Sequence, residues 1–382
     1  MKRVYLDHNA TTTLRPEARE VWVETLQELG GNPSSVHTSG RAARAVIDRA
    51  RERVAGALGV SESGIFFTSS GTEANNLALL GTMRAAAPGA ALTVLASDHA
   101  SVLEPARHLE AEGCELRLAS VGPEGLVNLD ELAQTARGSA LLSLAAANNE
   151  TGALVPLREV REALGGDALP IHTDAAQALG RIPLDLTGWG VDLASLSAHK
   201  VGGPVGVGVL VRCTSLPLKP VLFGGGQEEG LRPGTENAPA IAAAACAIEL
   251  AVAEQEEASA RWRKQTAYLW GELQGALPHL QVVGPPMDSP LRLPNTLNVL
   301  APGVDGRVIV TRLDLEGLEV SAGSACSSGS LEPSHVLAAM GFDEESARAA
   351  VRLSLGWETG DADLCRAVEI LSKTFSLARK SG

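Results

Sequence analysis

Cysteine is scarce in this chain of 382 residues: there are five, at positions 114, 213, 246, 326 and 365, and no two form a CxxC pair. An odd number of isolated thiols disfavours both a disulfide framework and a zinc site. We therefore expect reduced cysteines and no bound metal.

Long apolar runs are also missing, since no uninterrupted stretch approaches the roughly 18 residues that a membrane span needs. The first ten residues, MKRVYLDHNA, lack the apolar segment of a secretory signal. We expect a cytoplasmic protein without a membrane partner.

Positive charge is in short supply. The net charge of −13 disfavours the phosphate backbone of nucleic acid as a direct partner. The chain has only six lysines, and Lys200 is the only one between positions 3 and 218. A single lysine in so long a stretch makes its surroundings worth reading closely.

What the chain does have is a regular alternation of strand and helix patterns between residues 64 and 212. Such an alternation predicts an α/β fold with a mostly parallel sheet and crossover helices. We expect its seven strands at 64–69, 92–97, 115–120, 140–147, 170–175, 193–198 and 205–212. The last two are joined by a Gly/Pro-rich link too short for a crossover helix, so we expect them to pair antiparallel at one edge.

The remaining sequence predicts a second, smaller α+β domain. A long helical pattern runs from about 238 to 275, and strands are expected near 295–300, 317–321 and 349–355, before a helix that begins at 361. We assign residues 13–258 to the large domain, and residues 1–12 with 259–382 to the small one.

Polar clusters follow several predicted strands, where ligands of open α/β sheets bind. TSSGTEANN (68–76) leads from a strand into a helix, which suits either a phosphate or an ordinary helix cap. HTDAAQ (172–177) ends a strand with Asp174, either a solvated loop carboxylate or one that needs a cationic partner.

SAHK (197–200) ends another strand with Lys200. Such a lysine is either a surface charge or, when desolvated, an amine that forms a Schiff base. A phosphate cradle, an aspartate for a pyridinium nitrogen and a strand-end lysine are together what pyridoxal phosphate requires. His99, at the end of a further strand, is placed to lie flat on the ring of that cofactor.

On these motifs the chain resembles the cysteine desulfurases of the IscS/NifS type, class-V enzymes of the fold-type-I pyridoxal-phosphate group. The resemblance spans nearly the whole chain. The matching segments, in order, are YLDHNATT (5–12), NPSSVHTSGR (32–41), SSGTEANN (69–76), NNETG (148–152), HTDAAQ (172–177), SAHK (197–200), GGGQE (224–228), LRPGTEN (231–237), SAGSACSSGSLEPSH (321–335) and VRLSLG (351–356).

The resemblance implies a role for each matching residue. Lys200 would carry the cofactor, Asp174 would contact its ring nitrogen, Gln177 its ring hydroxyl, and His99 would stack on the ring and move protons. The phosphate would be held by Gly71, Thr72, Ser197 and His199, with Thr235 reaching it from the other subunit of a homodimer. Asn148 and Arg352 would bind the substrate carboxylate.

Cys326 stands among serines and glycines, which is unusual for a structural thiol. The resemblance implies that it takes sulfur from L-cysteine as a persulfide, releases L-alanine, and passes the sulfur to an acceptor protein, either an iron–sulfur scaffold or a tRNA-thiolation enzyme. The other four cysteines lie in apolar or helical patterns, which are typical of structural positions. The alternatives are a selenocysteine lyase, a class-V aminotransferase and a non-catalytic sulfur-relay protein.

Overall fold

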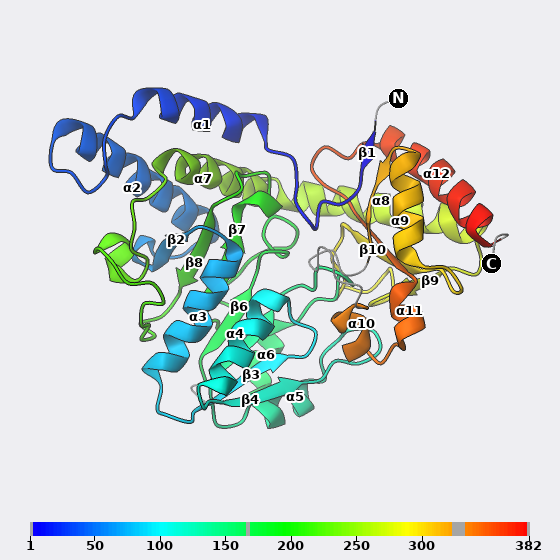
Figure 1. The fold of residues 1–382 in the computed structure, drawn as a ribbon, viewed down its shortest axis with the longest axis horizontal. Helices are drawn as coiled ribbons and strands as arrows, with labels where there is room; N and C mark the ends of the chain where they lie inside the picture. The colour runs from blue at the N-terminus through cyan, green and yellow to red at the C-terminus, as the bar shows by residue number, and fades with distance from the viewer. Residues whose placement is uncertain (1–2, 166–168, 323–332, 380–382) are drawn as a thin grey trace.

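The computed structural model describes residues 3–165, 169–322 and 333–379. Its centre is one seven-stranded sheet with the spatial order β2-β8-β7-β6-β5-β3-β4 (Figure 1). The strands are β2 (Ile65–Thr68), β3 (Ala91–Leu95), β4 (Glu115–Ala119), β5 (Ser139–Ala145), β6 (Ile171–Asp174), β7 (Leu193–Ser197) and β8 (Gly208–Arg212). The predicted seven-stranded, mostly parallel sheet is confirmed.

The position of β8 corrects one prediction. β8 pairs antiparallel with β7, as the short link between them predicted, but it does not form the edge. β2 pairs antiparallel along the other side of β8 and is itself the edge strand. Both neighbours of β8 are buried apolar strands, and their order in the sheet follows from tertiary packing, which the linear sequence does not record.

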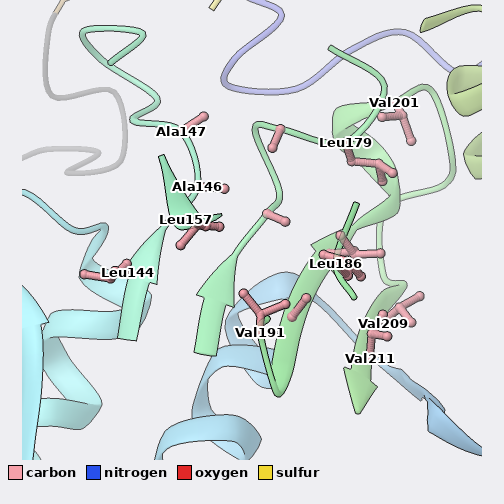
Figure 2. Packing of buried hydrophobic residues seen from close by; sticks show 14 of the residues in the cluster. Leu144, Ala146, Ala147, Leu157, Leu179, Leu186, Val191, Val201, Val209 and Val211 are labelled. Atoms are coloured by element: carbon pink, nitrogen blue, oxygen red, sulfur yellow. The ribbon is translucent and has the colours of Figure 1, made fainter. Parts of the chain in front are cut away.

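Helices cover both faces of this sheet. Alternate residues of β2 show the division, because Phe66 packs with α3 and α4 whereas Ile65 and Phe67 pack in the core on the opposite face. Figure 2 shows part of that opposite core, with Leu144, Leu157 and Val209 among its members. The helices are α1 (Pro16–Glu28), α2 (Thr38–Leu58), α3 (Gly71–Ala85), α4 (Ala100–Ala111), α5 (Leu129–Ala136), α6 (Leu157–Ala163) and α7 (Ala238–Ala253).

A separate apolar core is built from residues near the two ends of the chain, including Leu6, Leu297 and Phe375. It lies on the right in Figure 1, where the N-terminal strand meets the C-terminal helices. The elements there are β1 (Val4–Tyr5), α8 (Gln255–Ala276), β9 (Gln281–Val283), β10 (Thr296–Leu300), α9 (Gly306–Leu315), β11 (Leu318–Glu319), β12 (Ser321–Ala322), α10 (His335–Ala339), α11 (Glu344–Arg348), β13 (Ala350–Ser354) and α12 (Asp361–Arg379).

Two predictions for this region need correction. The helical pattern at 238–275 is broken at Glu254 into α7 and α8, which are bent by 67°. The strand expected at 317–321 is divided between two sheets, because β11 pairs with β1 whereas β12 pairs with β13. The division into domains of residues 13–258 and of 1–12 with 259–382 is kept as a proposal.

Among the described residues, no single helix combines the length and apolar character needed to cross a bilayer. The bent pair of α7 and α8 meets those criteria only when the two helices are taken together. Most residues of α7 are buried inside the protein.

Candidate active site

A cavity of about 270 Å³ opens where the central strands end. It lies beyond the carboxyl ends of β5, β6 and β7, at the start of α3 and α4, with Ala10 of the N-terminal segment on one side. Its lining includes the predicted site residues Gly71, Thr72, His99, Asn148, Asp174, Gln177, Ser197, His199 and Lys200. The structure therefore brings nine of the predicted residues around one space.

The turn from β2 into α3 forms the wall at Gly71. Ser70 caps the helix by accepting a hydrogen bond from the Glu73 N–H at 3.1 Å. A Cβ atom added at Gly71 would lie 3.1 Å from the Ser197 Cβ, so any larger residue would crowd the approach of the helix start to β7. The first N–H groups of α3 thus face the cavity with the positive end of the helix, which suits an anion.

His199 stands beside this turn as a neutral ring. Burial, together with the nearby charges of Lys200 and Arg181, lowers the pKa of His199 to about 4. One of its ring nitrogens, Nδ1, lies 3.0 Å from the Thr11 hydroxyl. A neutral imidazole can still donate one hydrogen bond to a phosphate oxygen.

Asp174 ends β6 with both carboxylate oxygens engaged. Oδ1 accepts from the Ala176 N–H at 3.0 Å, and Oδ2 accepts from the Asn75 amide at 2.8 Å. These contacts fix the orientation of the carboxylate at the edge of the cavity. It is placed to accept a further hydrogen bond from a cationic ring nitrogen.

Lys200 follows β7 in a short 3-10 turn (Ala198–Lys200). Its Nζ donates to the carbonyl oxygens of Asn9 and Ala10, each at 2.6 Å. The amine is therefore held by the N-terminal segment at the mouth of the same cavity. Gln177 is held by that segment too, because its Nε2 donates to Asn9 O at 2.9 Å while its Oε1 accepts from buried Arg181.

Asn148 stabilises the loop after β5 and keeps one hydrogen of its amide nitrogen for a further contact. Its Oδ1 accepts from the N–H groups of Glu150 and Thr151, and its Nδ2 donates to Ser97 O at 3.0 Å. An amide nitrogen carries two hydrogens, so the second can serve a ligand. Arg352 approaches this loop from β13, donating to Asn149 O at 3.1 Å and to Asp7 Oδ1 at 2.7 Å.

Of the predicted site residues that the structure describes, Thr235 and Arg352 do not line the cavity. Thr235 lines a separate hollow of about 230 Å³ with Phe67 and Arg232. Cys326 lies outside the described residues. Arg352 does not line the cavity itself, and it reaches the site through its contact with Asn149, which does.

The comparisons with known proteins identify the family of this chain. The model of the class-V aminotransferases matches residues 4–366. The chain belongs to this family. Among its relatives, the cysteine desulfurase IscS of Dictyoglomus turgidum is 41% identical, covering 99% of this chain and 96% of that one. IscS of Clostridium botulinum is 36% identical with the same coverage.

Solved structures of the family share the fold. A NifS-like protein superposes with a TM-score of 0.91 at 35% identity, covering 98% of this chain and all of that one. The NifS-like protein from Rickettsia africae gives a TM-score of 0.87 at 32% identity, with 98% and 99% covered. The fold-type-I architecture expected from the sequence is therefore confirmed.

Several residues of this class-V site escaped the sequence reasoning. Asn75, Ser101 and Asn9 all contact predicted site residues. Asn75 and Asn9 stand inside the quoted segments SSGTEANN and YLDHNATT, and Ser101 follows His99 by two positions. Buried Arg181 was missed because it joins the carbonyl oxygen of Gln177, four positions before it, to that of His8, which lies 173 positions away. No pattern in the sequence signals such contacts.

Two buried carboxyl groups were missed as well. Burial raises the pKa of Asp98 to about 7, although its oxygens accept from the N–H groups of Leu95 and Ala145. Burial likewise raises the pKa of Glu150 to about 7, opposed by the hydroxyl of Ser334, which donates to Glu150 Oε2 at 2.5 Å. Ser334 lies near the end of the segment SAGSACSSGSLEPSH (321–335), so this contact joins the end of that segment to the loop that Asn148 holds.

The described cysteines differ among themselves. Cys246 is buried, and Cys114 and Cys213 are partly buried. Burial raises the pKa of the Cys213 thiol to about 11 and also raises that of Cys114, so both are poor nucleophiles near neutral pH. Cys365 is exposed on α12. The helical pattern around it was typical of a structural position, but an exposed thiol does not pack in the core.

Proposed function

We propose that this chain is a pyridoxal-phosphate-dependent cysteine desulfurase, which converts L-cysteine to L-alanine and leaves the sulfur as a persulfide on Cys326. The observation that carries the proposal is the grouping of Lys200, Asp174 and the Gly71 turn around one cavity. Relatives named cysteine desulfurase that match 99% of the chain support the choice of reaction.

The residues present fit pyridoxal phosphate. The cradle at Gly71 is one that a Cβ would fill, and it offers helix N–H groups to a phosphate. Thr72, Ser197 and His199 lie around it, and Asp174 and Lys200 line the same cavity. When bound, this cofactor draws electrons away from the α-carbon of an amino acid, which makes the bonds at that carbon and the next one reactive.

The chain's own groups would bind and orient the cysteine. The second amide hydrogen of Asn148 and the guanidinium of Arg352 would hold its carboxylate, the latter by a planar fork. Lys200 would hold the cofactor until the substrate amine takes its place. Its freed amine would then move a proton at the α-carbon. His99 would stack on the ring and help move protons, and Gln177 would hold the ring hydroxyl.

Cys326 would take the sulfur. The thiolate of Cys326 attacks the sulfur of the substrate, an S–S bond forms, and the C–S bond breaks with its electron pair remaining on the substrate carbon. That carbon gains a proton and leaves as L-alanine. Cysteine and one enzyme thiol thus become alanine and one enzyme persulfide, with atoms and electrons balanced.

We further propose a homodimer whose sites are shared, with Thr235 reaching the phosphate of the partner. Thr235 lies outside the cavity of its own chain, and apolar side chains near its loop, Val36 and Phe223, are each 87% exposed. The Gln227 side chain links these segments, since it accepts from the Gly234 N–H and donates toward Ser34. A second subunit would cover such side chains.

The acceptor of the sulfur would be a cytoplasmic protein, an iron–sulfur scaffold or a tRNA-thiolation enzyme. The deciding experiment loads the purified protein with pyridoxal phosphate and L-cysteine and measures alanine together with persulfide on Cys326. Equal amounts of both in a single turnover are expected. Alanine without persulfide, or faster turnover of selenocysteine than of cysteine, would contradict the proposal and favour a selenocysteine lyase.

A further inference from the structure

Four side chains from α3, β6 and the capped start of α4 form a continuous hydrogen-bonded row along one wall of the cavity. Asn75 Nδ2, on α3, donates to Asp174 Oδ2 and to Ser101 Oγ, each at 2.8 Å. Ser101 Oγ, on α4, lies 2.7 Å from His99 Nδ1. Asn75 and Ser101 are 1% and 7% exposed, so water does not compete for these contacts.

The donors and acceptors in this row have only one arrangement. Both hydrogens of the Asn75 amide are used, and an amide nitrogen cannot accept. Ser101 Oγ therefore accepts from Asn75, and its own hydrogen is left for His99 Nδ1. The backbone N–H of Ser101 also donates to His99 Nδ1, at 3.1 Å. That nitrogen thus receives two donors and carries no hydrogen.

The reverse orientation of the Asn75 amide is disfavoured. It would place Oδ1 against the carboxylate of Asp174, where two acceptors would face each other. In the observed orientation, Oδ1 is buried and has no partner among the described residues. Burying an oxygen without a partner costs free energy, so the position is used for its two N–H donors.

We propose that Asn75 and Ser101 are positioning residues that keep the His99 ring neutral, with its proton on Nε2, and that they link this state to the carboxylate of Asp174. A second ring proton would have to enter at Nδ1, against two donors. His99 therefore enters the reaction as a neutral ring whose Nε2–H can donate a hydrogen bond, since the loss of that proton would leave an imidazolate. The inference rests on the proposed function only for the cofactor that Asp174 and His99 would face.

The charged and titratable groups around His99 are the same in every variant below. Asp98 and Glu150 interact electrostatically with its ring. Others share the cavity or the adjoining groove on α4, namely Glu104, His108, Asp174, His199 and Lys200. Differences between variants therefore report the row itself.

The test follows the ring nitrogens of the eight histidines by NMR in the pyridoxal-phosphate-loaded enzyme labelled with ¹⁵N-histidine, over a range of pH. A His99→Gln variant assigns the His99 signals. In the parent, Nε2 should carry the proton and Nδ1 none at neutral pH. Ser101→Ala removes one opposing donor, and Asn75→Ala frees the Ser101 hydroxyl to accept. Each should raise the pH at which His99 gains its second proton by about half a unit, roughly a threefold change in proton affinity.

Because both substitutions act on one row, the double variant should shift no further than the larger single shift. Ser101→Thr keeps the hydroxyl, so its His99 should titrate as in the parent. The amide of Asn76 donates to Thr72 O outside the row, so the control Asn76→Ala should also leave the titration unchanged. A proton on Nδ1 in the parent, additive shifts or no shift would overturn the inference. Ser101→Ala decides the question even if Asn75 variants fold poorly.

The titration needs no turnover of cysteine. A protein that shows the predicted shifts but makes no alanine would contradict only the proposed function. One that makes alanine without the shifts would contradict only the role of Asn75 and Ser101.

Discussion

Arg352 and Asp7 form an ion pair 2.7 Å long between residues 345 positions apart in the chain. The guanidinium is fully buried, and the carboxylate side chain is 19% exposed. The pair ties the N-terminal segment, which also holds Lys200, to β13. Arg352 Nε is buried and has no hydrogen-bond partner among the described residues.

Removing Asp7 should therefore weaken the fold as well as the site. Asp7→Ala leaves a buried guanidinium without its counter-charge, and we expect a loss of about 3 kcal/mol in the free energy of unfolding. Urea denaturation measures it. Glu104→Ala, which breaks the exposed pair with Arg107, is the control and should change the free energy by less than about 1 kcal/mol. If Asp7→Ala and Glu104→Ala lower the free energy of unfolding by the same amount, the buried ion pair contributes no more to stability than the exposed one.

The cofactor should be attached through Lys200. Borohydride reduction of the loaded enzyme, followed by peptide mapping, should place the pyridoxyl group on Lys200, because its amine lies at the cavity that Asp174 and the Gly71 turn share. Lys200→Ala should not retain the group through reduction and denaturation. A pyridoxyl group on Lys219 would overturn the assignment.

Much of this site could be predicted because its residues stand at strand ends. Asp174, Ser197 and Lys200 end or follow buried strands, and parallel strands bring their carboxyl ends to one edge. The edge position of β2 could not be predicted, because the order of strands depends on which apolar faces meet in three dimensions.

The contacts inside the site were equally beyond the sequence. Asn75 and Ser101 lie 26 positions apart, and their hydrogen bond depends on how α3 and α4 pack side by side. Helical periodicity gives the buried face of each helix, but it does not say which polar side chains will meet across two such faces.

A shared site predicts a particular result for mixed dimers. When Lys200→Ala and Thr235→Ala subunits are combined, each heterodimer should have one site with both changes and one with neither. About half of the parental activity per heterodimer should return, although both parent dimers are weak. If Thr235 acts in its own subunit, no unaltered site can form and mixing will restore nothing.

Glu150 should make stability depend on pH. Burial raises its pKa from 4.5 to about 7, so the folded state holds the proton more tightly than the unfolded chain. The stability that this provides is fully present below about pH 4.5 and is lost as the pH rises through about 7. Glu150→Gln does not titrate and still offers an oxygen to the Ser334 hydroxyl.

The free energy of unfolding of Glu150→Gln should therefore gain on that of the parent between about pH 5 and pH 8, by up to about 3 kcal/mol. Urea denaturation at several pH values measures this difference. Glu110→Gln, on the exposed side of α4, controls for the change from acid to amide. A constant difference across the pH range would mean that Glu150 is ionised throughout.

Cys326→Ser should separate binding of the cofactor from transfer of the sulfur. The groups proposed to hold pyridoxal phosphate come from the strand ends around the cavity, so the variant should remain coloured and its spectrum should still change when L-cysteine is added. A serine hydroxyl stays protonated near neutral pH and is a poor nucleophile toward sulfur, so alanine formation should fall by at least about a hundredfold.

Cys365→Ser, at the one exposed cysteine of the described residues, is the matched control and should keep the parental rate. Alanine formation by Cys326→Ser at a rate close to that of the parent, without added thiol, would mean that sulfur leaves the substrate without this thiol. The enzyme would then release its sulfur or selenium directly, and the proposed desulfurase reaction would be wrong.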